Sequence, residues 1–346
     1  MKNNSLSASK AKPEPDAVNA KRTKVVVIGG GSGRFTLLEG LRRFPLDISA
    51  IVSMTDSGGS SGRLRAELGV LPPGDVRQCL VALSTSPKVM LDLFNYRFSE
   101  GSLAGHSFGN LFLTALEKTT GSFDKAVEEC ERILAIEGRV IPVTLGKSEL
   151  VAQLEDGTEI EGETNIDIPK AKRARIKKVF LRPQVNATQK ALEAITDANL
   201  IVIGPGDLYT SIIPNLLVGG ISKAICDSKA VKVFVLPLAT KHGETDGFSP
   251  HKFVKEIEHY CGCSTQFVVS NSRGFPQELL ATYGKEGAEP VICNSDEIFG
   301  SKVVCADLLS QAEGLARHDP IRTAQAVLSC LGNGFGHYTK SRGEMK

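Results

Sequence analysis

The chain has 346 residues, of which 41% are hydrophobic, a formal net charge of +2 and eight cysteines. This length and apolar content are enough to bury one large α/β core, and the small net charge argues against a protein that binds nucleic acid by neutralising phosphates. No apolar run approaches the roughly 18 residues needed to span a bilayer. Residues 1–22 lack the apolar stretch of a secretion signal, so we expect a cytoplasmic protein with a disordered N-terminal tail.

The first predicted strand, residues 25–28, ends in Gly-Gly-Gly-Ser-Gly at residues 29–33. Apolar residues then recur at helical spacing over residues 35–41. Glycines allow a ligand to approach the backbone, and the first amides of a helix point outward at the positive end of its dipole. A phosphate is the natural occupant of such a turn, although a tight strand–helix turn that needs glycine only for packing explains the same residues. The pattern departs from the dinucleotide fingerprint, and no P-loop motif occurs.

The second predicted strand, residues 48–54, leads into another loop of small residues, Asp56-Ser57-Gly58-Gly59. Asp56 has three possible roles: holding ribose hydroxyls, capping the next helix, or binding a metal. Asp75 opens a further predicted helix, where it either caps that helix or faces the same cavity as Asp56. Two carboxylates beside phosphates suit Mg²⁺, so Asp56 and Asp75 are the candidate metal ligands of a magnesium-dependent transferase.

The pattern changes between residues 148 and 167, where apolar and polar residues alternate about an Asp-Gly turn. This predicts a small antiparallel β-hairpin inserted into the α/β frame. A strand at residues 176–181 then resumes.

The second half repeats the opening pattern. A predicted strand at residues 199–203 ends in a loop with Gly204, Gly206, Thr210 and Ser211, and the strand at 231–236 is followed by the polar loop 239–247. Ligands of open α/β sheets bind at the carboxyl ends of the strands. Several such loops therefore predict an extended cleft for a large polar ligand, such as a nucleotide or a nucleotide-sugar.

The eight cysteines are scattered and include no CxxC pair. Most lie in apolar stretches, which is typical of buried, reduced thiols in a cytosolic protein. Cys261 and Cys263 form a CxC pair that is either incidental or redox-active. No paired ligand spacing predicts zinc.

These segments resemble the gluconeogenesis-factor (YvcK) proteins, in the superfamily of 2-phospho-L-lactate transferase (CofD), over residues 24–330. The resemblance rests on VVVIGGGSG, TDSGGSSGRLR, LPPGDVRQCLVALS, GHSFGNLFLTAL, GPGDLYTSIIPNLLV and HGETDGF. It implies a three-layer αβα Rossmann-like sandwich with a mainly parallel sheet. We expect one such domain at residues 23–332, with a polar tail at 333–346.

The resemblance also implies a function. Gluconeogenesis factors bind UDP-sugars such as UDP-N-acetylglucosamine and link carbon metabolism to cell-wall precursor synthesis and cell shape, with no settled catalytic activity. The transferase branch instead moves a phospholactyl group from a guanosine diphosphate adduct to a deazaflavin, with Mg²⁺. By position, the resemblance assigns Tyr283 and Arg317 to the UDP-sugar, whereas a core role for Tyr283 and a local ion pair for Arg317 are the structural alternatives. Arg34 is a further candidate phosphate contact.

The expectations are therefore as follows. The first hypothesis is a non-catalytic nucleotide-sugar-binding regulator, and the alternatives are a Mg²⁺-dependent phospholactyl transferase and an NAD(P)-binding protein. No cofactor is required except Mg²⁺ in a transferase, and the expected partners are a UDP-sugar or other nucleotide, a regulated metabolic enzyme and a second copy of the chain, with no nucleic acid. The candidate ligand-binding residues are Gly30, Gly31, Ser32, Gly33, Asp56, Ser57, Gly58, Gly59, Asn110, Gly204, Gly206, Thr210, Ser211, Thr240, Tyr283 and Arg317.

Overall fold

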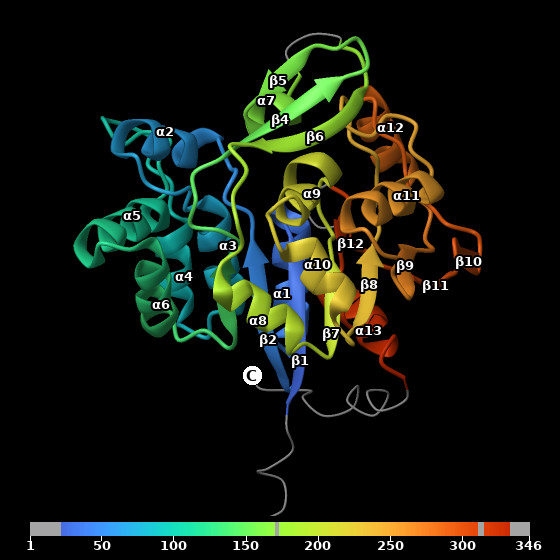
Figure 1. Ribbon diagram of the computed structural model, residues 1–346, viewed down its shortest axis with the longest axis horizontal. Coiled ribbons are helices and arrows are strands. Elements are labelled where there is room, and N and C mark those ends of the chain that lie inside the picture. The colour runs from blue at the N-terminus through green and yellow to red at the C-terminus, as the bar shows by residue number, and fades with distance from the viewer. Residues whose placement is uncertain (1–21, 170–172, 311–314, 333–346) are drawn as a thin grey trace, which may run out of the picture.

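An eight-stranded sheet runs through the centre of the computed structural model, which describes residues 22–169, 173–310 and 315–332 (Figure 1). The predicted tails at 1–22 and 333–346 lie outside the described residues, apart from residue 22. The strand order is β10-β11-β9-β8-β7-β1-β2-β3, and all pairs are parallel except β10 with β11. The strands are β1 Thr23–Gly29, β2 Leu46–Val52, β3 Arg139–Pro142, β7 Leu200–Ile203, β8 Val231–Val235, β9 Phe267–Asn271, β10 Glu297–Ile298 and β11 Ser301–Ala306.

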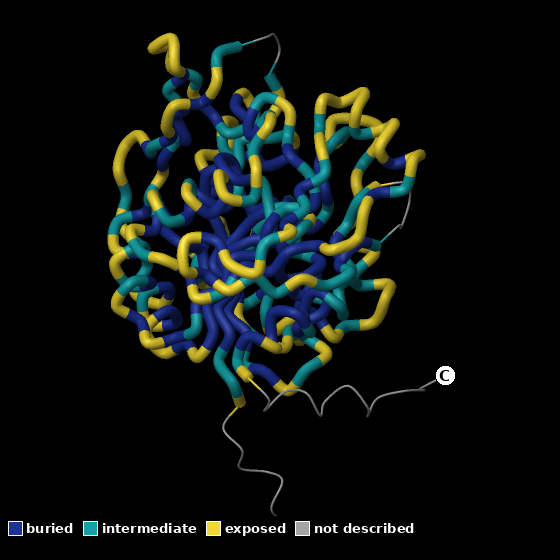
Figure 2. The backbone as a smooth tube through the Cα atoms, turned by 90° about the vertical axis from the view of Figure 1, so that its right-hand side faces the viewer, coloured by how far each residue is buried: buried dark blue, intermediate teal, exposed yellow. Residues whose placement is uncertain are grey.

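The central strands are continuous apolar runs because both of their faces are covered. Residues 25–28 of β1 are at most 1% exposed, and residues 200–203 of β7 are fully buried. Strands buried on both sides need no polar alternation. Figure 2 shows the same arrangement as a buried centre surrounded by exposed loops. The prediction of a mainly parallel α/β fold is confirmed.

Helices cover the sheet in two layers (Figure 1). Helix α1 packs against α3 and α13, whereas α10 packs against α8 and α11. The helices of the sandwich are α1 Gly31–Leu41, α2 Gly59–Leu68, α3 Gly74–Leu83, α4 Lys88–Asn95, α5 Phe108–Thr120, α6 Phe123–Ile133, α8 Gln189–Thr196, the π-helical turn η2 Leu208–Ile212, α9 Ile213–Leu216, α10 Ile221–Asp227, α11 Pro250–Cys261, α12 Gln277–Lys285 and α13 Pro320–Ser329.

An antiparallel unit stands above the carboxyl edge of the sheet, at the top of Figure 1. It comprises β4 Glu149–Leu154, β5 Glu159–Glu161, the short helix α7 Glu163–Asp167 and β6 Ile176–Arg182. The unit is larger than the hairpin expected at 148–167, because β6 pairs with β4 rather than with the main sheet. A further two-stranded sheet, β12 Leu309–Ser310 and β13 Arg317–His318, leads into α13.

The cysteines differ from their prediction in one pair. Cys226 and Cys263 form a disulfide across 37 residues of sequence. The other cysteines are free, and all of them except Cys305 are buried. The expectation of reduced thiols is therefore wrong for this pair, because only the fold brings the two residues together.

The contact between α1 and α13 depends on Gly40. A Cβ atom on Gly40 would overlap the carbonyl oxygen of Pro320 and lie 3.1 Å from the Cβ of Ala324. We expect Gly40→Ala to lower the free energy of unfolding by about 3 kcal/mol, because the backbone carbonyl at the start of α13 has to move away. Chemical denaturation measures this change.

Gly284 provides the matched control. It also lies inside a helix, but a Cβ placed there meets no atom within 4 Å. Gly284→Ala should therefore be neutral or stabilise by up to about 1 kcal/mol. Equal effects of the two substitutions would contradict close packing at Gly40.

Candidate functional site

The loops that follow β1 and β7 meet at the switch point of the sheet. These strands are neighbours, but the chain continues from β1 toward β2 and from β7 toward β8, on opposite sides. In open α/β sheets, ligands bind outside the carboxyl ends of the strands at such a point. The fold therefore brings together the first and third of the loops singled out in the sequence.

The glycines of the first loop divide into two roles. A Cβ on Gly30 would lie 2.6 Å from the Cβ of Ser211, and a Cβ on Gly33 would lie 3.1 Å from the carbonyl oxygen of Pro205. These two glycines let the loops after β1 and β7 pack together. Gly31 has a φ of 62°, and the nearest atom to a Cβ there is the Ser211 Oγ at 4.0 Å. Gly31, the first residue of α1, therefore has open space in front of it.

The second loop is organised by Asp56. Its carboxylate accepts a hydrogen bond of 2.9 Å from the amide of Gly58, and its carbonyl accepts one from Arg65 at 3.1 Å. Burial and the carboxylate of Asp75 raise the pKa of Asp56. A Cβ on Gly59 meets nothing within 4 Å, so this second helix start also faces open space.

Arg34 lies beneath the first loop rather than beside a ligand. Its side chain is fully buried, donates to the carbonyl oxygen of Gly29, and forms an ion pair of 3.2 Å with Asp75. The hypothesis that Arg34 contacts phosphate is therefore wrong. Its guanidinium instead joins the end of β1 to the start of α3, and Asp75 is its counter-ion.

Helix α7 of the antiparallel unit lies against the second loop. The Ser57 hydroxyl accepts from the amide of Thr164 at 3.0 Å and donates to the Thr164 hydroxyl at 3.3 Å. Burial, with Asp56 and Asp167 nearby, raises the pKa of Glu163 to about 7. The inserted unit thus adds acidic side chains to the edge where the loops converge.

A second set of acidic side chains surrounds Lys241, beside the third loop. Its ammonium donates to Asp167 and, at 2.7 Å, to Asp207, and it lies 3.8 Å from Glu244. Burial and Asp207 raise the pKa of the fully buried Glu244 to about 8. The Thr210 hydroxyl donates to Glu244 at 2.9 Å. The three carboxylates could ligate a cation, and Lys241 already supplies the positive charge among them.

A cavity of about 370 Å³ opens beside the switch point. The Tyr283 hydroxyl accepts from the amide of Ala316 at 3.1 Å, and the Tyr283 ring packs edge-on against Phe275 at 5.5 Å. Ala316 adjoins β13, whose first residue is Arg317. The cavity is lined by Ser32, Gly33, Pro205, Gly206, Asp207, Pro237, Leu238, Ala239, Thr240, Lys241, His242, Tyr283, Glu286, Ala288, Ala316 and His318.

Three predicted residues make structural contacts in this arrangement. The Thr240 hydroxyl accepts from the amide of Glu289 at 2.8 Å while Thr240 also lines the cavity. The Asn110 side chain accepts from the buried Arg77 at 3.1 Å and does not line the cavity, and Arg77 in turn interacts with Asp75 and Asp56. Gly204 has a φ of 82° and turns the chain at the end of β7.

Sequence reasoning missed Glu163 and Asp167 as parts of this edge. Glu163 and Asp167 lie in the inserted unit, whose position above the sheet has no local signal. The sequence places Glu244 in the polar loop at 239–247, but the pairing of Lys241 with Asp207 and of Glu244 with Thr210 depends on the fold.

The mainly parallel sheet with its covering helices defines an α/β protein of the Rossmann-like class, and comparison with known proteins gives its family. A family model described as 2-phospho-L-lactate transferase CofD matches residues 25–309. The chain belongs to this family.

Within the family, the chain groups with the gluconeogenesis factors. A putative gluconeogenesis factor of Thermotoga maritima is 45% identical over 310 residues, covering 88% of this chain and 98% of that protein. The gluconeogenesis factor of Bacillus subtilis is 39% identical over 316 residues, covering 90% and 99%. The crystal structure of protein BH3568 from Bacillus halodurans superposes with a TM-score of 0.86 at 41% identity, covering 89% of this chain and all of that one.

Every helix in the described ranges is too short or too polar to cross a membrane.

The raised pKa of Glu163 predicts a pH-dependent stability. Its folded-state pKa of about 7 lies above the ordinary value of 4.5, so the folded protein binds the proton more tightly. Its contribution is present below pH 4.5 and is lost as the pH rises toward 7. Glu163→Gln should therefore raise the free energy of unfolding at pH 8 by on the order of 1–3 kcal/mol, and should change that free energy little at pH 4.

Thermal unfolding at both pH values measures this difference. Glu161→Gln, on the exposed end of β5, is the control and should change stability little at either pH. A gain for Glu163→Gln that is the same at pH 4 and pH 8 would rule out a titrating carboxyl.

Proposed function

We propose that this protein binds a nucleotide-sugar of the UDP-N-acetylglucosamine type and acts as a cytoplasmic regulator that links carbon metabolism to cell-wall precursor synthesis and cell shape. One observation carries the ligand class. A single cavity is lined by Ser32 and Gly33 of the first turn of α1 and by the aromatic ring of Tyr283. It combines a place for a diphosphate with a place for a ring.

The diphosphate is proposed to lie at the start of α1. The open space at Gly31 and the unpaired amides of the first helical turn favour an anion there. Arg317 is not among the residues that line the cavity, although its neighbours Ala316 and His318 are. It forms no ion pair among the described residues, and we propose it as a bidentate phosphate contact on the basis of the resemblance.

The hydroxyl-rich part of the ligand is proposed to face the carboxylates. Ionised carboxylates accept hydrogen bonds, and sugar and ribose hydroxyls donate them. Asp56 and Asp207 are the partly exposed acids of the second and third loops. Tyr283 supplies a flat face for a uracil or sugar ring.

A Mg²⁺-dependent phospholactyl transferase is the second candidate. It is favoured by the electrostatic coupling of Asp56 with Asp75 and Glu163, which a cation would relieve. The ion pair between Asp75 and Arg34 weighs against it, because Asp75 already has a cationic partner.

Calorimetric titration with UDP-N-acetylglucosamine, GDP and NAD, each with and without Mg²⁺, separates these functions. We expect selective binding of the UDP-sugar without a requirement for Mg²⁺ and without turnover. Mg²⁺-dependent GDP binding would favour the transferase, and binding of NAD alone would favour a dinucleotide-binding protein. Light scattering of the same sample tests the proposed homodimer, and co-purification of a metabolic enzyme tests the proposed partner.

Gly31→Val should abolish binding of the UDP-sugar, because its methyl groups fill the space before α1. Gly157→Val is the matched control for backbone strain. It also replaces a left-handed glycine, with a φ of 88° and nothing within 4 Å, but it lies in the β4–β5 turn. Titration of both folded variants measures the effect, and equal affinities would remove the first loop from the site.

Tyr283→Ala should weaken binding about 10-fold or more, while Tyr283→Phe should retain most of it, because stacking needs the ring and not the hydroxyl. Tyr96→Ala, on an exposed side chain remote from the cavity lining, controls for the loss of an aromatic ring. Unfolding of Tyr283→Ala would instead support the core role of this residue.

A further inference from the structure

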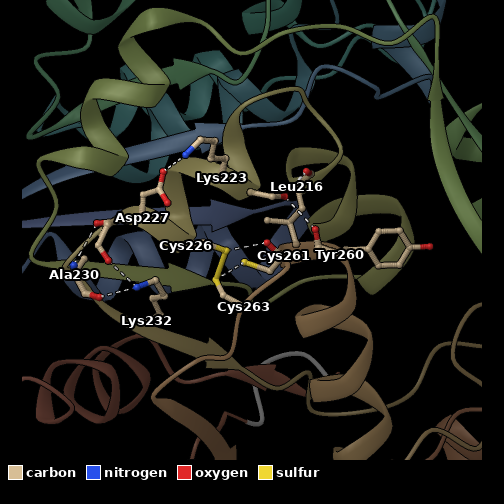
Figure 3. Close-up of a disulfide and its surroundings, with 11 residues drawn as sticks. Leu216, Lys223, Cys226, Asp227, Ala230, Lys232, Tyr260, Cys261 and Cys263 are labelled. Carbon is tan, nitrogen blue, oxygen red and sulfur yellow. Dashed lines mark hydrogen bonds and ion pairs between the residues drawn. A yellow bond between two sulfur atoms is a disulfide. The ribbon is translucent and has the colours of Figure 1, made fainter.

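Three cysteine sulfurs converge where α10 and α11 end (Figure 3). Cys226 lies in the last turn of α10, Cys261 ends α11, and Cys263 follows two residues later. Their Sγ atoms all lie within 4.8 Å of one another. Cys226 and Cys263 are joined, and the free Cys261 Sγ lies 3.7 Å from that of Cys263. A third sulfur is thus in place beside an existing disulfide.

The charge around the cluster disfavours a bound metal ion. Lys232 is 6% exposed, and its ammonium donates to the carbonyl oxygens of Ser228 at 2.8 Å and Ala230 at 3.4 Å. In the described part of the chain, it forms no ion pair with a carboxylate. A buried ammonium needs negative charge nearby and opposes a second cation. Burial and, to a smaller extent, Glu258 raise the pKa of Cys261, whereas a hydrogen bond from the backbone of Cys263 and the charge of Lys232 lower it.

We propose that Cys226, Cys261 and Cys263 form a thiol–disulfide exchange site. The Cys261 thiolate attacks the Cys263 Sγ, a Cys261–Cys263 bond forms, and the Cys226–Cys263 bond breaks. Cys226 leaves as a thiolate and takes up the proton that Cys261 lost. Sulfur oxidation states are conserved, so no external oxidant or reductant is consumed.

The exchange removes the covalent link between α10 and the end of α11. In the observed state the disulfide ties α10 to the end of α11, whereas both sulfurs of the product belong to the end of α11. The Ser222 hydroxyl of α10 donates to the carbonyl of Tyr260 at 3.0 Å, and the Tyr260 hydroxyl accepts from the amide of Val179 at 2.9 Å. Val179 belongs to β6, so the helices that the disulfide joins are connected to the unit above the candidate site. This inference does not depend on the identity of the ligand.

The reaction is slow at neutral pH because its nucleophile is protonated. Burial raises the pKa of Cys261 to about 11. The reacting species is the thiolate, whose population grows about tenfold per pH unit below that pKa. The exchange is therefore latent at pH 7 and becomes faster in base.

Disulfide mapping of the full-length protein tests the exchange. Protein purified without reductant is held at pH 7, 8, 9 and 10, quenched in acid, and mapped by mass spectrometry after alkylation. We expect Cys226–Cys263 at the start, followed by Cys261–Cys263 with an alkylatable Cys226, at a rate that rises about tenfold per pH unit. Cys261→Ser should abolish this change, and Cys305→Ser, at the exposed free cysteine, should leave it intact.

Two results overturn the proposal. One is a Cys226–Cys263 disulfide that persists at every pH in the wild-type protein. The other is an absence of the disulfide together with one equivalent of zinc per chain, which would make the cluster a metal site.

Hydrogen exchange tests the connection to the inserted unit. In Cys226→Ser, which lacks the disulfide between α10 and α11, the Val179 amide should exchange its hydrogen several-fold faster than in the wild type. The amide of Val151 in β4 serves as the internal reference. An unchanged ratio of the Val179 and Val151 exchange rates would show that the disulfide constrains α10 and α11 alone, and would overturn the coupling to β6.

Discussion

The architecture of the candidate site depends on one buried cation. Arg34 is fully buried directly below the glycine loop that follows β1. A guanidinium in such a position must be paired, because leaving it uncompensated costs several kcal/mol. Its bonds to the carbonyl of Gly29, to the backbone of Asp75 and to the Asp75 carboxylate satisfy most of this requirement. The end of β1 and the start of α3 are therefore fixed relative to each other.

The position of Asp75 in turn sets the electrostatics of the second loop. Its carboxylate contributes to the raised pKa of Asp56, which with Asp167 raises that of Glu163. Lys241 is the cationic partner of Asp167, Asp207 and Glu244. Two cations thus organise the acidic side chains of the edge. Burial makes three of these carboxyls, Asp56, Glu163 and Glu244, harder to ionise, because each has a raised pKa.

The sequence was sufficient to predict the elements and the edge at which their loops gather. A buried strand followed by glycine, serine and aspartate is a local pattern, and the carboxyl ends of parallel strands share one edge. The local sequence does not show which glycine of a loop packs against another segment and which one faces open space. Gly30 and Gly31 are adjacent and identical in type, yet Gly30 packs on Ser211 and Gly31 faces open space, because the difference depends on the loop after β7.

Long-range pairing explains the other differences from prediction. Arg34 points inward because its counter-ion lies 41 residues later, and β6 leaves the main sheet because β4 offers it a partner. The disulfide between Cys226 and Cys263 needs the ends of α10 and α11 to be adjacent. Each of these contacts joins segments that carry no common sequence pattern, so only the assembled fold can place them.

The inserted unit connects the two halves of the sheet across the switch point. It reaches the first half through Thr164 and Ser57, and the second half through Asp167 and Lys241. At its far edge, Val179 is bonded to Tyr260 of α11. Because these contacts come from α7 and β6 of one small sheet, a displacement of that sheet changes both loops together. Through the hydrogen bond between Val179 and Tyr260, the same displacement also reaches the end of α11, so the two loops and α11 are joined by one small unit.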